Sequence, residues 1–147
     1  MSRLLHFTDM HLRHHQPGTA YNPKRLSRSM LATLELLEVR VHQLVPDVVV
    51  MTGDLLDIPD EVIDGASPDG RPNAEWLLEA LADFQLVKDW FDGIGVPYIV
   101  IPGNHDHEAT FEQVFGDTTG PRDEAGFRFF SFWDQLAGDR QPERVKT

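Results

Sequence analysis

The sequence contains no cysteine, which excludes disulfide bonds and thiolate metal sites. Any metal ion would therefore be held by nitrogen and oxygen ligands. The sequence also lacks an uninterrupted apolar run of about eighteen residues, so it predicts no transmembrane helix and no membrane partner. No apolar signal-peptide segment precedes Asp9, and a cytoplasmic location is the expectation.

Basic residues are scarce, with 13 Lys and Arg against 24 Asp and Glu, for a net charge of −11. Proteins that bind nucleic acids generally contact the phosphates through Lys and Arg, so a nucleic-acid partner is not expected here. The length of 147 residues fits one domain with a core of its own, and 41% hydrophobic residues is typical of a globular protein.

Three short apolar runs alternate with two stretches of helical periodicity. The runs, which read as buried strands, are Arg3 to Thr8, Asp47 to Thr52 and Pro97 to Ile101. The first helix is expected from Asn22-Pro23 to Pro46, and the second from Asn73 to Gly93. This alternation predicts an α/β fold with a parallel βαβαβ sheet and flanking helices.

The remaining segments carry weaker signals. Residues 58–72 are rich in proline and glycine and predict a loop. Glu108 to Phe115 is a candidate short helix, and Gly126 to Trp133 is a candidate strand with several aromatic residues. That strand is expected either to be buried on both faces or to lack a partner sheet, and Gln135 to Thr147 reads as a tail.

A motif rich in metal-ligating residue types follows each of the three expected strands. The motifs are Asp9-x-His11, Gly53-Asp54 and Gly103-Asn104-His105-Asp106. Each one taken alone is also explained as an ordinary turn. The carboxyl ends of parallel strands share one edge of a sheet, so the three motifs together predict a single site at that edge.

This order of motifs resembles the calcineurin-like metallophosphoesterases. Within that family, the segment from Phe7 to Leu12 is most similar to bacterial phosphodiesterases of the cyclic-nucleotide type and to DNA-processing nucleases. The resemblance implies a centre of two divalent metal ions (Mn, Fe or Zn) and a phosphate-ester substrate, with a nucleotide among the candidates. It also implies roles for six residues: Asp9 and His11 on the first metal, Asp54 bridging both, Asn104 on the second, His105 at the phosphate or its leaving group, and Asp57 orienting His105.

The expected chemistry is hydrolysis of a phosphomonoester or phosphodiester by metal-activated water. Two metal ions clamp the phosphoryl group, a bridging carboxylate such as Asp54 holds both ions, and the neutral Asn104 amide limits the negative charge. A histidine near the leaving group can donate a proton near neutral pH, and it acts better when a carboxylate fixes its second nitrogen.

The chain departs from the family pattern in its second half. The family carries further histidine ligands, including a Gly-His-x-His motif, but the last of the seven histidines here is His107. We therefore expect one metallophosphoesterase domain over residues 1–147, truncated relative to the family. Its motifs lie within residues 3–107, residues 108–147 are weakly defined, and the fold is the first half of an αββα sandwich. Such a chain should bind one metal tightly at most and hydrolyse esters poorly.

Two other functions stay open. One is an incomplete or inactive piece that acts as a binding or assembly module and self-associates through residues 126–133. The other is a nucleotide-binding module without hydrolysis, although no glycine occurs between Asp9 and His14 where such modules carry them.

Six other residues have plainer or weaker interpretations. His6 is expected in the core, and His14 and His15 in an exposed loop. Arg25 and Arg28 are expected at the surface rather than as phosphate contacts, and His107 is a weaker alternative metal ligand.

Overall fold

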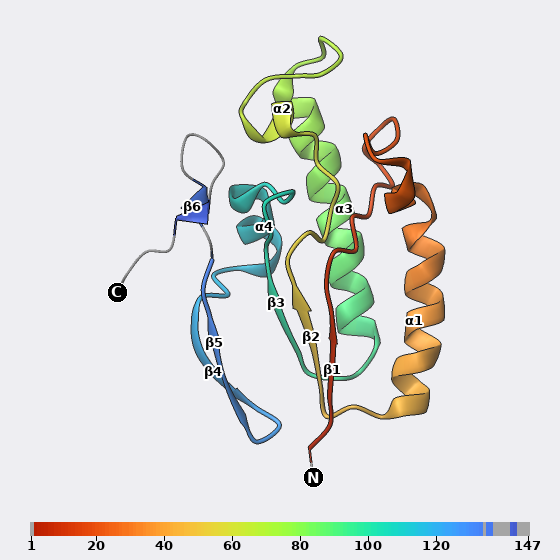
Figure 1. The fold of residues 1–147 in the computed structure, drawn as a ribbon, viewed down its shortest axis with the longest axis vertical. Coiled ribbons are helices and arrows are strands. Elements are labelled where there is room, and N and C mark those ends of the chain that lie inside the picture. Colours follow the sequence, from red (N-terminus) through yellow and green to blue (C-terminus); the bar gives the residue numbers. More distant parts are fainter. Residues whose placement is uncertain (1, 134, 137–141, 144–147) are drawn as a thin grey trace.

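Three parallel strands form the centre of the fold in the computed structural model, which describes residues 2–133, 135–136 and 142–143 (Figure 1). They are β1 (Leu4–Phe7), β2 (Val48–Thr52) and β3 (Tyr98–Ile101), arranged in the order β1-β2-β3. Phe7 pairs with Met51, and Thr52 pairs with Ile101, so the three strands end at the same edge of the sheet. The predicted parallel α/β fold is confirmed.

The helices follow the predicted alternation with two differences. They are α1 (Met30–Leu44), α2 (Asp60–Ile63), α3 (Asn73–Gly93) and α4 (Glu108–Phe115), and two 3-10 turns, η1 (Pro23–Arg25) and η2 (Ser27–Ser29), precede α1. The helix expected from Asn22 therefore starts later, because Leu26 has a left-handed backbone (φ 52) that separates the two turns. In addition, α2 lies within the stretch predicted as a loop. Among the described residues, no helix is long and apolar enough to cross a membrane.

One face of the sheet packs against the helices and forms the main core. Side chains alternate along a strand, and Val49, Met51 and Val100 point to this face. They join fully buried residues of α3, among them Phe84 and Phe91, in one continuous apolar cluster. This core carries most of the buried apolar surface and thus most of the hydrophobic stabilisation.

The opposite face of the sheet is covered only in part. Val48, Val50 and Ile99 are buried there against Ala125 and Phe129. These two residues belong to an antiparallel hairpin of β4 (Gly120–Glu124) and β5 (Phe127–Ser131), which lies on the side of the sheet away from α1 (Figure 1).

Next to the hairpin, the outer side of β1 is open. Leu4 is 42% exposed and His6 is exposed, with its Nε2 2.7 Å from the Thr52 hydroxyl. The expectation that His6 lies in the core is therefore wrong, because no layer covers this part of the sheet among the described residues.

The aromatic strand is a hairpin strand rather than a buried one. In β5, Phe130 is 62% exposed, and Phe132 beyond it is 71% exposed, so burial on both faces is wrong. Within the segment expected to be a tail, β6 (Gln135–Leu136) pairs with β7 (Pro142–Glu143), and the rest of that tail lies outside the described residues.

Candidate metal centre

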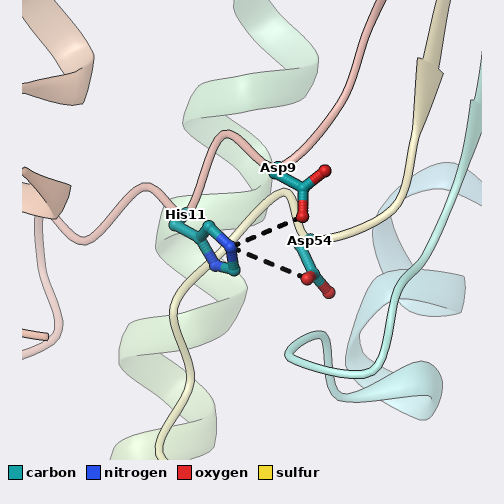
Figure 2. Close-up of side chains that lie close together, drawn as sticks. All are labelled: Asp9, His11 and Asp54. Carbon is teal, nitrogen blue, oxygen red and sulfur yellow. Dashed lines mark ion pairs between the residues drawn. The ribbon is translucent and has the colours of Figure 1, made fainter. Parts of the chain in front are cut away.

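Asp9, His11 and Asp54 meet at the carboxyl edge of the sheet. Asp9 and His11 lie on the loop that follows β1, and Asp54 lies on the loop that follows β2 (Figure 2). Backbone hydrogen bonds join the loops, from the His11 N–H to the Asp54 carbonyl oxygen and from the Leu12 N–H to the Leu55 carbonyl oxygen. The two loops therefore form one unit that extends the β1-β2 pairing beyond the sheet.

All three residues have a left-handed backbone, with φ of 56 for Asp9, 50 for His11 and 53 for Asp54. They make up three of the six non-glycine residues with positive φ in the described part of the chain. Such conformations cost free energy, and they tend to gather where function requires a particular side-chain direction. Here they turn three potential ligands toward one point.

The three side chains have the spacing of ligands that share a cation. His11 Nε2 lies 3.8 Å from an Asp9 oxygen and 3.6 Å from an Asp54 oxygen (Figure 2). Two ligand atoms bound tetrahedrally to one zinc-like ion are about 3.4 Å apart, since each bond is about 2.1 Å long. The nitrogen and oxygen donors thus fit a divalent metal ion with little movement.

The electrostatics of His11 suit a metal ligand. The residue is buried, and burial is the main cause that lowers its pKa, although the nearby Asp54 carboxylate acts in the opposite direction. The neutral imidazole is the form that binds a metal. The other ring nitrogen, Nδ1, is buried without a hydrogen-bond partner among the described residues and lies 3.9 Å from an Asp57 oxygen. Asp57 is thus the candidate for an outer carboxylate that orients a ligating histidine, but at 3.9 Å the two groups are not hydrogen-bonded.

The third motif packs against the second through two glycines. A Cβ atom on Gly103 would lie 2.3 Å from both the backbone nitrogen and a side-chain oxygen of Asp54, and one on Gly53 would lie 3.1 Å from the Gly103 Cα. The His105 N–H donates to the Asp54 carboxylate at 3.0 Å. Asn104, which is exposed, therefore lies on a turn whose two flanking residues contact Asp54.

Asp106 holds these loops together, a role that sequence reasoning did not assign. Its buried carboxylate accepts hydrogen bonds from the backbone N–H groups of Leu55, Leu56 and Gly103 at 2.8–3.0 Å. Burial raises the pKa of Asp106 to about 7, against the lowering effect of these three donors. The sequence did contain a signal for this role, namely the acidic residue at the fourth position of Gly-Asn-His-Asp, directly after a tight turn.

The expected contact between Asp57 and His105 is not among those formed by the described residues. Asp57 is buried and accepts hydrogen bonds from Arg13, Arg25 and Ser27 instead. His105 Nε2 lies 3.1 Å from an Arg25 nitrogen, and His105 Nδ1 lies 3.9 Å from an Asp60 oxygen. The His105 ring also packs edge-on against His11, with ring centroids 5.2 Å apart, so it borders the centre.

Arg25 borders the candidate centre and is half-buried, so the expectation of a plain surface residue is wrong. Its side chain bridges Asp57 and His105, and it is 26% exposed. The left-handed Leu26 ends η1 directly after Arg25, so this segment does not follow the periodicity of a continuous helix. No pattern in the sequence marked that break.

The other histidines have structural contacts. His107 caps α4, and its ring nitrogen lies 2.7 Å from the Thr110 hydroxyl, so the described structure gives it no place in the centre. His15 contacts Asp83, a fully buried residue of α3 that also accepts bonds from backbone N–H groups of residues 14–16. This contact fixes the loop after β1 to the helical layer.

The comparison with known families agrees with this geometry. No curated protein matches the chain significantly. The model of the calcineurin-like phosphoesterase family, whose members are generally hydrolases that use divalent metals, matches residues 2–144. Since this match spans nearly the whole chain and includes all three motifs, the protein belongs to the calcineurin-like phosphoesterase family.

Proposed function

We propose that this chain binds divalent metal at Asp9, His11 and Asp54 and hydrolyses a phosphate ester. The observation that carries the proposal is the convergence of these three side chains, each on a left-handed backbone, at the spacing of ligands on one ion. The bound metal would supply the positive charge that activates water and polarises the phosphoryl group.

The residues around the centre have distinct roles in this proposal. Asp54 would reach both metal positions, since one of its oxygens faces His11 and the other accepts the His105 N–H. Asn104 would supply a neutral oxygen ligand on the side of the third motif. His105 would face the phosphate or its leaving group. Asp57 would orient His11, whose Nδ1 lies 3.9 Å from an Asp57 oxygen. Mn, Fe and Zn all suit such donors.

We propose unequal affinities for the two metal ions. Among the described residues, the proposed ligands of the first metal are Asp9, His11 and Asp54, and those of the second are Asp54 and Asn104. Water molecules would complete the coordination of the second metal ion, and its binding should be weaker. The chain should accordingly bind one metal tightly and turn over slowly at moderate metal concentrations.

The proposed substrate class includes phosphomonoesters and phosphodiesters, with nucleotides among them. The similarity of Phe7 to Leu12 to cyclic-nucleotide-type phosphodiesterases supports the diester option. The cytoplasmic location stays a prediction from the sequence.

The test combines metal binding with hydrolysis. Isothermal titration with Mn²⁺ or Zn²⁺ should show one tight site, and Asp54→Asn should weaken it by about tenfold or more because a carboxylate ligand is lost. Hydrolysis of bis(4-nitrophenyl) phosphate should fall by at least about a hundredfold in the same variant. Asp89→Asn is the matched control, since Asp89 is exposed on α3, away from the three motifs, and accepts a hydrogen bond from Gln85. Equal behaviour of Asp54→Asn and Asp89→Asn would overturn the proposal.

A second function is favoured by the exposed aromatic surface of the hairpin. Phe130 in β5 and Phe132 just beyond it are 62% and 71% exposed. We propose that this surface supports self-association through residues 126–133, either with hydrolysis or in its place.

A further inference from the structure

A cavity of about 730 Å³ adjoins the candidate metal centre. Arg25, Asp57 and His105 line its inner end, and these residues also contact or border His11. Cavities that bind small molecules commonly have volumes of about 300–1,000 Å³. The size therefore fits a small organic group rather than a lone water molecule or ion.

The inner end of the cavity holds two guanidinium groups around a buried carboxylate. Asp57 is the single carboxylate between two guanidinium groups, those of Arg13 and Arg25. Arg13 is buried and donates to Asp57, Pro17 and Thr19, so its hydrogen bonds are used within the fold. Two guanidinium groups thus face the Asp57 carboxylate, while Asp60, Glu61 and Asp69 bring further acidic groups to the same cavity. An anion would therefore be held by hydrogen-bond donors of Arg25 rather than by a net positive charge of the cavity.

Arg25 has hydrogen-bond donors that its contacts to neighbouring side chains do not use. Of the five N–H groups of a guanidinium, its contacts to Asp57 and His105 use two, and the other three bind no side chain among the described residues. An arginine cannot accept, so His105 Nε2 accepts in this contact. A phosphate oxygen is a stronger acceptor than an imidazole nitrogen, because it carries charge. The remaining N–H groups of Arg25 are thus available to a phosphate between the candidate metal centre and the cavity.

The rest of the cavity has a different character. Tyr21, Ile58 and Pro59 give it apolar walls, and the Tyr21 ring is fully exposed. Asp60 and Glu61 bring acidic groups to the same lining. Acidic side chains accept hydrogen bonds from hydroxyl and amino groups and repel further phosphates. This part suits an uncharged organic group with hydrogen-bond donors, and it disfavours a nucleic-acid strand.

We propose that this cavity is the substrate subsite, in which Arg25 binds the phosphate and the outer walls hold the uncharged organic group of a small phosphate ester. The inference rests on the proposed function, since it assumes that the phosphate reacts at Asp9, His11 and Asp54. It adds a binding residue and a substrate class to that function.

The first test measures binding without metal, by titrating the protein with inorganic phosphate and with 4-nitrophenyl phosphate and following ³¹P NMR. Arg25→Gln should weaken both by about tenfold, and Arg25→Lys should weaken them less, because it keeps the charge but loses the fork. Arg40→Gln removes the same charge from the exposed face of α1, and it should change nothing. Tyr21→Ala should weaken the binding of 4-nitrophenyl phosphate more than the binding of inorganic phosphate.

A second measurement separates this inference from the proposed function. With Mn²⁺ present, Arg25→Gln should raise the KM for 4-nitrophenyl phosphate, whereas Arg40→Gln should not. If the parent protein does not hydrolyse the ester but its phosphate binding still depends on Arg25, the proposed metal chemistry is refuted and the anion site is retained. Active hydrolysis with equal phosphate binding and KM in both arginine variants would overturn the subsite. Tighter binding of a DNA or RNA oligonucleotide than of the small esters would overturn the substrate class.

Discussion

The two faces of the three-stranded sheet differ in what covers them. The helical face packs Val49, Met51 and Val100 against α3 in a continuous core. The opposite face buries only Val48, Val50 and Ile99 under a two-stranded hairpin, and it leaves Leu4 on β1 exposed. Among the described residues, the helical face is covered throughout, and the opposite face carries interior-type residues under a partial cover.

The difference explains where the candidate site obtains its rigidity. Along the loop after β1, the buried residues Met10 and Leu12 alternate with Asp9 and His11, and both belong to the helix-side core. Leu55 and Leu56, which follow Asp54, also belong to this core. The apolar residues fasten the loops to the core, so the intervening polar residues project at the edge of the sheet. The site therefore depends on the helical face more than on the hairpin face.

The largest effect on stability should come from the helix-side core. Phe84→Ala removes a fully buried ring that packs edge-on against Phe111 and Phe115. We expect a loss of about 4 kcal/mol in the free energy of unfolding, measured by urea denaturation. A loss below about 1 kcal/mol would show that this face is no better packed than the other.

A second effect, of about 3 kcal/mol, is expected for Asp106→Ala. The substitution leaves the N–H groups of Leu55, Leu56 and Gly103 without their acceptor. Because these groups hold the loops of the centre, metal affinity should fall together with stability. Asp106→Asn keeps one acceptor oxygen and should lose less. Normal metal affinity in a destabilised Asp106→Ala protein would show that the Asp106 hydrogen bonds do not shape the metal centre.

The sharpest comparison of the two faces uses adjacent valines of β2. Val49 is fully buried on the helical face, and Val50 is 8% exposed on the hairpin face. We expect Val49→Ala to cost about 2.5 kcal/mol and Val50→Ala about 1 kcal/mol in urea unfolding, because the thinner layer over Val50 can relax into the space. Equal costs would mean that the hairpin covers its face as firmly as the helices cover theirs.

Sequence reasoning succeeded where a periodic or consecutive pattern encodes structure. The apolar runs that end at Asp9, Gly53 and Pro102 identified the strands, and parallel pairing then placed the motifs at one edge. It failed for Arg25, since the left-handed Leu26 breaks the helical pattern and turns the preceding segment toward the site. It also failed for His6, because exposure depends on a covering layer and not on the strand itself.

The hydrogen-bond partners of Asp57 were also not predicted from the sequence. The sequence places Asp57 three residues after Asp54, but its partners come from distant segments that carry Arg13 and Arg25. Three-dimensional neighbours of this kind follow from loop conformation, which no local pattern in the sequence specifies. The β4 strand was missed for a related reason, since Gly120–Glu124 is exposed or half-buried and has no apolar alternation.

The smallest effect on stability, and the clearest on assembly, is expected at the hairpin surface. Phe130 is 62% exposed, so Phe130→Ser should change the free energy of unfolding by less than about 0.5 kcal/mol. If the hairpin face binds a second copy of the chain, the same change should weaken self-association, because an exposed aromatic side chain is removed beside an unpaired strand edge. Sedimentation velocity over a range of concentrations measures this directly. Leu36→Ser is the control, since Leu36 is 70% exposed on α1, away from the hairpin. Weaker association in the Phe130 variant alone would assign assembly to the hairpin face. Equal weakening in both variants, or a parent protein that stays monomeric at high concentration, would remove the hairpin as an assembly surface and leave the exposed aromatic residues without that explanation.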